Sequence, residues 1–219
     1  MAQSDKNLQP KKRRAFKYGL IGLISIVLLY HSFYVVSLDS RANESVDGDV
    51  AQMADDYFLQ TLPSVMENAP TPCMLLSALG EEDHDWKTYG KQTNIGNRYY
   101  FLVQGEGTVE EIEDNFVKVV FGEGAKTCSL RVATVYIFGN EIRDASGELL
   151  LQDVGELTKF NAVSELINKK VRDDIIPHFL NEVQVGQKIR LAAAFALNRR
   201  VGVTDDFEVM PIQMQIIDE

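Results

Sequence analysis

The chain has 219 residues, of which 45% are hydrophobic and 25% charged, the balance of a globular protein with one sizeable domain plus appendages. Its formal net charge is −10, and the acidic excess lies after residue 17, where 31 acidic residues face 16 basic ones, a net charge of about −15. A domain this acidic repels phosphate backbones, so we expect no nucleic-acid partner.

The amino-terminal region has the pattern of a membrane anchor. Residues 1–17 form a basic tail, and residues 18–38 hold no formal charge, which suits a helix of about 31 Å that crosses a bilayer core. The basic tail predicts a cytoplasmic amino terminus, a single pass through the bacterial inner membrane and a periplasmic domain. A signal peptide cleaved near Ala42 is the alternative, but the apolar run exceeds the usual signal core, so we favour an uncleaved anchor.

Residues 39–97 are predicted to form a linker and a helical segment. The linker is polar, and apolar residues then recur at helical spacing over residues 50–66, where Pro63 bends the helix or restarts it. A second short helix is predicted from Pro72 to Gly80. We therefore expect two short helices before the first strand.

Residues 98–219 alternate in hydrophobicity as strands do. Gly105 and Gly107 interrupt the first strand, where glycine marks a bend or a bulge, and Pro211 indicates an edge or a bulge in the last one. The predicted elements are strands over residues 99–112, 116–121, 128–138, 186–197 and 207–217 and a helix over residues 160–175.

Five strands with a helix between the third and the fourth is the order of an oligonucleotide/oligosaccharide-binding (OB) barrel. We predict an α+β fold, in which residues 98–219 form a mainly antiparallel OB-like five-stranded barrel and the amphipathic helix closes one end. An open α+β sandwich is the alternative, because strand order alone does not establish closure.

Several segments resemble a known bacterial family. They are GNRYYFLVQGEGTV (96–109), YIFGNEIRDASG (136–147), FNAVSELINKKVRDDIIP (160–177) and VGQKIRLAAAFAL (185–197), within a resemblance that extends from Tyr34 to Ile217. The family is catalogued as domain of unknown function 2291 and described as predicted periplasmic lipoproteins. Its genes often neighbour ribose-type sugar ABC transporters, so the resemblance implies an accessory role beside sugar uptake and carries over no catalytic residue. Many members have a lipid-attachment cysteine after the apolar run, and this chain has none there.

The candidate binding site is the polar turn that follows the predicted third strand. Asn140, Arg143 and Asp144, with Asn161 and Asn168 from the next helix, would gather donors and acceptors at one mouth of the barrel for a small solute or a transporter subunit. The alternative, which we favour, is a structural ion pair with a helix cap, because polar loop residues more often satisfy backbone groups than bind a ligand.

Residue types that bind metals or catalyse reactions do not gather in the sequence. His31, His84 and His178 are scattered, and the acidic run at residues 80–85 is more typical of a solvated loop than of a chelating one. We therefore expect no metal, no cofactor and no enzymatic activity. A membrane-anchored binding or accessory module is the predicted function, and a structural envelope scaffold is the alternative.

Cys73 and Cys128 are the two cysteines, in a domain expected to face an oxidising compartment. A disulfide between them and two separately buried thiols both stay open, because the helix that carries Cys73 need not reach the third strand.

Overall fold

The computed structural model describes residues 18, 20–23, 25, 28, 48–81, 85–93, 96–124, 126–204 and 207–217. The chain divides into two compact units, Met1–Ser45 and Val46–Glu219. The predicted basic tail and most of the predicted anchor lie outside the described residues, as do His31 and His84. Within the part that is described, no helix combines the length and the apolarity needed to cross a membrane.

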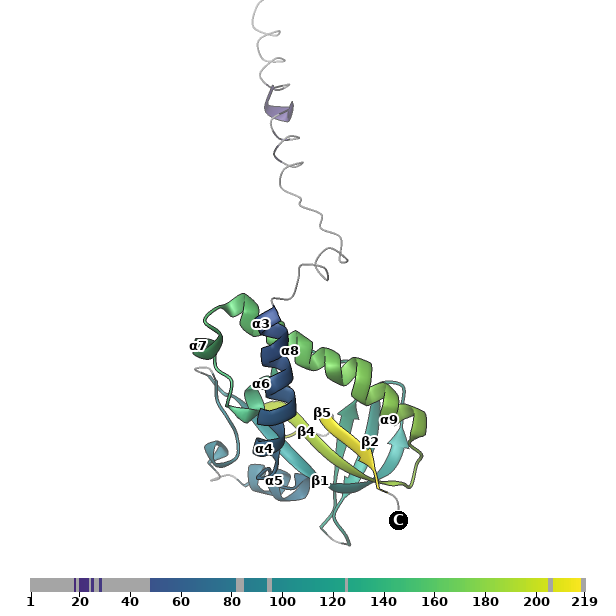
Figure 1. Ribbon diagram of the computed structural model, residues 1–219. Coiled ribbons are helices and arrows are strands. Elements are labelled where there is room, and N and C mark those ends of the chain that lie inside the picture. The colour runs from purple at the N-terminus through teal and green to yellow at the C-terminus, as the bar shows by residue number, and fades with distance from the viewer. Residues whose placement is uncertain are drawn as a thin grey trace, which may run out of the picture. The chain divides into compact units, whose positions relative to one another are not determined.

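Five strands of the second unit close into a barrel in the order β1-β2-β3-β5-β4 (Figure 1). They are β1 (Arg98–Ile112), β2 (Phe116–Phe121), β3 (Cys128–Ala133), β4 (Lys188–Asn198) and β5 (Glu208–Ile216). Closure confirms the OB-like barrel and excludes the open sandwich. The expectation of a mainly antiparallel barrel needs a correction, because β3 and β5 pair in parallel and the barrel is mixed. A closed ring with an odd number of strands cannot alternate in direction throughout, so one parallel pair is unavoidable.

The first strand is long enough to serve two neighbours. Its first part pairs with β4 from Arg98 to Thr108, and its second part pairs with β2 from Gly107 to Ile112. A Cβ atom at Gly107 would lie 2.7 Å from both Val119 Cγ1 and the Val120 carbonyl oxygen, so only glycine fits this close approach. Gly107 therefore lets β1 pass close to β2, and the register of β1 shifts beyond the glycines, between Val109 and Glu111.

One hydrophobic core fills the barrel interior. Alternate residues of the strands point inward, Phe101 and Phe195 stack with ring centroids 5.4 Å apart, and the Trp86 ring meets Phe101 edge-on. Leu75 and Phe179 close the barrel from two helices. The helices around this core are α5 (Pro72–Leu79), η2 (Trp86–Thr88) and α9 (Ile176–Glu182).

A second core lies between the outer face of the barrel and a layer of helices, which Figure 1 shows on one side of the strands. Ala192 and Ala194 face this layer, whereas Leu191 and Phe195 face the interior, so β4 is hydrophobic on both faces. The small alanines let the helices approach closely. The helices that complete the structure are α3 (Gly48–Asp56), η1 (Tyr57–Thr61), α4 (Leu62–Met66), α6 (Glu141–Ser146), α7 (Leu151–Val154), α8 (Leu157–Lys170) and η3 (Val171–Ile175).

The predicted third strand is too long by five residues. Ala133 pairs with Phe116, the first residue of β2, so the chain beyond Ala133 has run past its partner strand. Tyr136 and Phe138 consequently lie exposed, although their spacing fits a strand. The following segment, expected as a turn, is the short helix α6, which Gly147 ends with a φ of 71° in the left-handed region.

The last strand carries the irregularity that Pro211 indicated. Ala193 pairs with Pro211 and Ala192 with Gln213, so Ile212 is an extra residue with no partner on β4. This bulge confirms the prediction and reverses which side chains of β5 point inward.

Cys73 of α5 and Cys128 at the start of β3 form a disulfide, with 5.3 Å between their Cα atoms. The sequence left open whether the two cysteines form a disulfide or remain separate thiols, and the structure shows the disulfide. The bond attaches the helix that closes one end of the barrel to the wall it covers.

Candidate functional site

The predicted polar site is centred on a buried ion pair. Arg143 and Asp144 lie on α6 with side chains only 5% and 2% exposed, and Arg143 Nε is 2.7 Å from Asp144 Oδ1. A charge this deep is stabilised only if its remaining hydrogen-bonding atoms also find partners. The surroundings of the two side chains therefore decide whether the site is open to a ligand.

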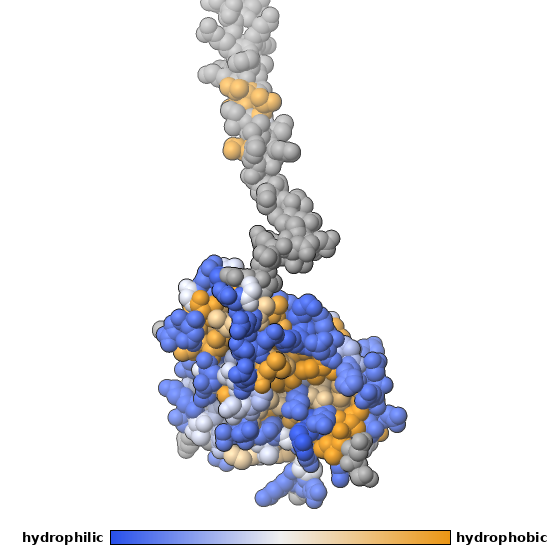
Figure 2. Space-filling model, in the orientation of Figure 1, coloured by the Kyte–Doolittle hydropathy of each residue, from blue (hydrophilic) through white to orange (hydrophobic). Residues whose placement is uncertain are grey.

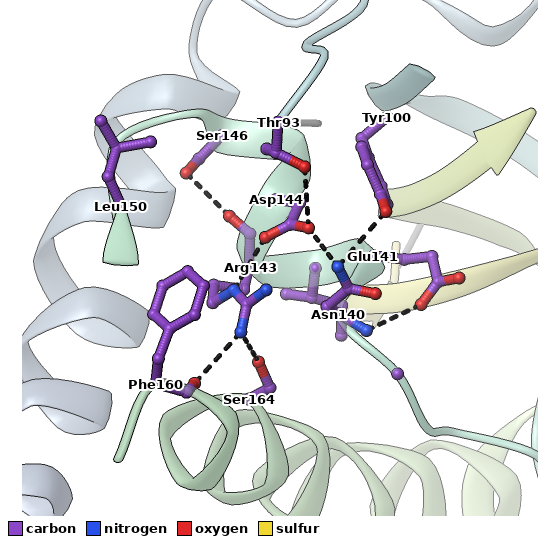
Figure 3. Close-up of polar contacts among 12 residues, drawn as sticks. Thr93, Tyr100, Asn140, Glu141, Arg143, Asp144, Ser146, Leu150, Phe160 and Ser164 are labelled. Carbon is purple, nitrogen blue, oxygen red and sulfur yellow. Dashed lines mark hydrogen bonds and ion pairs between the residues drawn. The ribbon is translucent and has the colours of Figure 1, made fainter. Parts of the chain in front are cut away.

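The guanidinium of Arg143 is enclosed by the amino-terminal part of α8. Its Nη1 donates to the Phe160 carbonyl at 3.1 Å and to Ser164 Oγ at 2.7 Å (Figure 3). Its central carbon lies 3.5 Å from the centroid of the Phe160 ring, a stacked cation–π contact. The arginine thus ties α6 to α8 through a carbonyl, a hydroxyl and a ring, while its carboxylate partner lies on α6 itself.

The carboxylate of Asp144 is enclosed from the other side. Thr93 Oγ1 donates to Oδ2 at 3.2 Å, and Asn140 Nδ2 donates to the same oxygen. Asn140 also donates to Tyr100 Oη at 3.3 Å, which links the cluster to β1. Asn140 occupies the position of a helix cap, but its side chain bonds the carboxylate and the tyrosine instead of the backbone of α6.

A tyrosine from η1 holds the carbonyl end of α6. Tyr57 Oη lies 2.8 Å from the Arg143 carbonyl oxygen, 3.1 Å from that of Ile142 and 2.8 Å from Ser146 Oγ. Burial is the main cause that raises the pKa of the Tyr57 hydroxyl, because the phenolate would be desolvated. Sequence reasoning missed Tyr57, since a contact across more than eighty residues leaves no local signal.

Four of the five predicted site residues come together, and Asn161 does not. Asn168 is buried and donates from Nδ2 to the Gly139 carbonyl at 2.9 Å. Phe160, Ser164 and Asn168 form the i, i+4, i+8 row of α8 that faces α6, which leaves Asn161 exposed outside this row. Ser164, and not Asn161, supplies the polar group of α8 that contacts Arg143. The sequence held a signal for this, because Ser164 lies four residues before Asn168 and therefore on the same face of the helix.

The cluster around Arg143 is closed. Arg143 Nε and Nη1 and both carboxylate oxygens of Asp144 have partners within the protein, so the geometry favours the structural interpretation over a ligand mouth. Among the described residues, no three of the metal-binding types His, Cys, Asp and Glu gather into a group that could hold an ion.

An open apolar groove lies on the same side of the molecule as the helix layer. It has a volume of about 540 Å³ and runs between η1 and α4 on one wall and η3 and α9 on the other, with β5 beneath. Figure 2 shows hydrophobic surface exposed between these helices. Its apolar lining includes Phe58, Leu59, Met66, Ile175, Ile212 and Met214.

The sequence did not reveal the groove. Leu59 falls outside the apolar stripe that the helical spacing of residues 50–66 defines, and it is 68% exposed. An apolar residue out of phase with its helix is a weak signal on its own, because single exposed leucines are common. The wall opposite is more than a hundred residues away in the chain.

The structure defines the class of protein as an OB-type barrel covered by helices. It carries a buried ion-pair cluster around Arg143 and an open apolar groove. The chain belongs to the family described as "Predicted periplasmic lipoprotein (DUF2291)", whose model matches residues 23–215, and this confirms the resemblance seen in the sequence. The family description gives an extracytoplasmic, membrane-associated location.

A solved structure of an OB-fold protein from Thermotoga maritima MSB8 is similar to this one, with a TM-score of 0.68. The match has 24% sequence identity and covers 77% of this chain and 98% of that chain, and at this identity it shows the fold alone. A search of curated proteins found no match.

Tyr57→Phe should lower the free energy of unfolding by about 1–3 kcal/mol, because buried acceptors on α6 lose their donor. The raised folded pKa of Tyr57 means that its contribution is full below its unfolded pKa of 10.0 and is lost as the pH rises above that value. The wild-type protein should therefore lose more stability between about pH 8 and about pH 11 than the variant does.

Urea unfolding at the two pH values measures both effects. Tyr136→Phe is the matched control, because it removes the same hydroxyl from a tyrosine that lies exposed at the surface. An alkaline loss of the same size in Tyr57→Phe and wild type would show that the hydroxyl is not held as described.

Proposed function

We propose that this protein is a membrane-anchored extracytoplasmic accessory module that works by holding a partner in the groove and catalyses no reaction. One contrast carries the proposal. The charged cluster around Arg143 is buried and paired, whereas the groove beside Leu59 is open and apolar. Exposed apolar surface of this kind is typical of interaction sites.

A single-pass helix over residues 18–38 is the proposed anchor. The basic tail before it and the lack of formal charge within it support a cytoplasmic amino terminus and a periplasmic barrel. The chain has no cysteine between residue 18 and residue 72, so a lipid attached directly after the apolar run is not part of the proposal.

The proposed partner is a protein of the cell envelope. The family resemblance implies a subunit of a sugar transporter, with a small solute as a further candidate ligand. Residues 46–219 hold 29 acidic and 15 basic residues, a net charge of −14, which argues against nucleic acid. A scaffold that only spaces other envelope components is the alternative, and it would need no groove.

Photo-crosslinking in intact cells tests the groove as the working surface. A photoreactive amino acid at position 59 should give a discrete crosslinked protein, because its side chain would lie against the partner. Position 201 is the matched control, since Val201 is 67% exposed and lies outside the groove lining. Absence of any crosslinked protein from position 59, or the same products from both positions, would remove the groove as the working surface.

A further inference from the structure

We infer that the groove receives an apolar polypeptide segment flanked by lysine or arginine side chains, carried by another protein outside the cytoplasm. This inference rests on the proposed function, because it names the partner of the same groove. The length, the lining and the charge of the groove each point to this occupant.

The groove continues into two neighbouring hollows. It shares Asp174 with a hollow that begins beside Leu166, and it shares His178 and Met214 with a hollow that reaches Glu182. Together they follow α8, η3 and α9 from Leu166 to Glu182, which spans about 24 Å at the rise of a helix. That length matches a helix of about four turns and exceeds what one sugar ring fills.

Both walls of the groove change from α-helical to π-helical turns. These are η1 and η3, which carry Leu59 and Ile175 on opposite sides of the apolar centre. π-Helical turns are rare and are frequently found at functional sites. A groove with apolar side chains along two helical walls is the form that binds the apolar face of an amphipathic helix.

The charges along the groove are complementary to basic side chains. Lysines at one end are compensated within the protein, in the pairs Lys169–Asp173 and Lys170–Asp55. Asp174 in the middle and Glu182 at the far end make no ion pair in the part of the chain that the structure describes. A partner with lysine or arginine beside its apolar residues would supply the missing charges.

Two other occupants fit less well. A second copy of this chain would bring the same carboxylates, Asp174 and Glu182, to the groove. Each copy of residues 46–219 has a net charge of −14, so the two copies would repel each other. A sugar needs convergent polar groups that fix its hydroxyls, whereas the lining of the groove is mostly apolar and includes three polar residues, Asp174, His178 and Gln213.

Peptide binding to the full 219-residue chain in nanodiscs of neutral phospholipid tests the inference. The probes are two labelled peptides of about 16 residues, which span about 24 Å as helices. Both carry leucines on one face, and the other face carries lysines in one peptide and glutamates in the other. Fluorescence anisotropy, with empty nanodiscs as the blank, should show binding of the lysine peptide alone.

Variants assign the binding to the groove. The double variant Asp174→Asn/Glu182→Gln should weaken the lysine peptide about two-fold to thirty-fold, the effect of losing two exposed charge contacts. About 1 M NaCl should act in the same direction, since the Debye length is then about 3 Å. Leu59→Glu should also weaken binding, and the matched controls Glu123→Gln and Val201→Glu, outside the groove, should not.

Three results would overturn the inference. These are equal binding of the two peptides, no binding of either, and lysine-peptide binding that Asp174→Asn/Glu182→Gln leaves unchanged. In each case a crosslinked protein from position 59 would still support the proposed function, so the two failures are distinguishable. A concentration-dependent dimer abolished by Leu59→Glu would assign the groove to a second copy.

Discussion

Asp144→Ala should lower the free energy of unfolding by about 3–5 kcal/mol, because it leaves the Arg143 guanidinium buried without its counter-charge. The same change removes the acceptor of Thr93 and Asn140, so their side-chain donors lose a partner as well. Urea unfolding of the purified chain measures the effect, and a shift of the midpoint without a change of slope would mark a loss of stability alone.

A double-mutant cycle separates the pair from its surroundings. Arg143→Met/Asp144→Leu should cost less than the sum of its two single changes, because neither charge is then left alone in the core. Glu106→Ala is the control, since its ion pair with Arg190 is exposed on both sides and should contribute little. Unchanged stability of Asp144→Ala together with a lost partner interaction would instead make the cluster the working surface.

The barrel could be predicted from the sequence because its strands have a repeating environment. Along β4, Leu191, Ala193 and Phe195 face the barrel interior while Ala192 and Ala194 face the helices, so the strand alternates between two buried environments. The special position of Gly107 in β1 was readable for a similar reason, since a side chain there would collide with β2. A steric requirement at one position can be read from the residue type at that position.

Features that depend on a distant partner were not readable. Tyr136 and Phe138 alternate like a strand, but β2 begins too late to pair with them, and no property of residues 134–138 reveals that. The contact of Tyr57 with α6 and the groove between η1 and η3 likewise join segments far apart in the chain. A ring of five strands requires at least one parallel pair, but the sequence did not show that β3 and β5 form it.

Reduction of the disulfide should have the other large effect. The bond joins Cys73 and Cys128 across a sequence separation of 55 residues, and closing a loop of this size stabilises the folded state by about 4 kcal/mol in the chain-entropy estimate. Reductant should therefore lower the melting temperature by about 8–16 °C, given that about 1 kcal/mol shifts a domain of this size by about 2–4 °C. The double variant Cys73→Ala/Cys128→Ala should melt near the reduced protein and should not respond to reductant.

The helix α5 gives this prediction a structural readout beyond the melting temperature. Its residue Leu75 is fully buried in the barrel core, so α5 should stay docked after reduction but open more often. Hydrogen exchange of the α5 amides should quicken more than that of β4, whose contacts do not include the bond. Intact mass is the direct check of the bond itself, because reduction adds two hydrogens. Two thiols that alkylate in the unfolded, unreduced chain would show that the cysteines are not bonded. The stability difference between Cys73→Ala/Cys128→Ala and wild type would then report only the loss of two partly buried sulfurs.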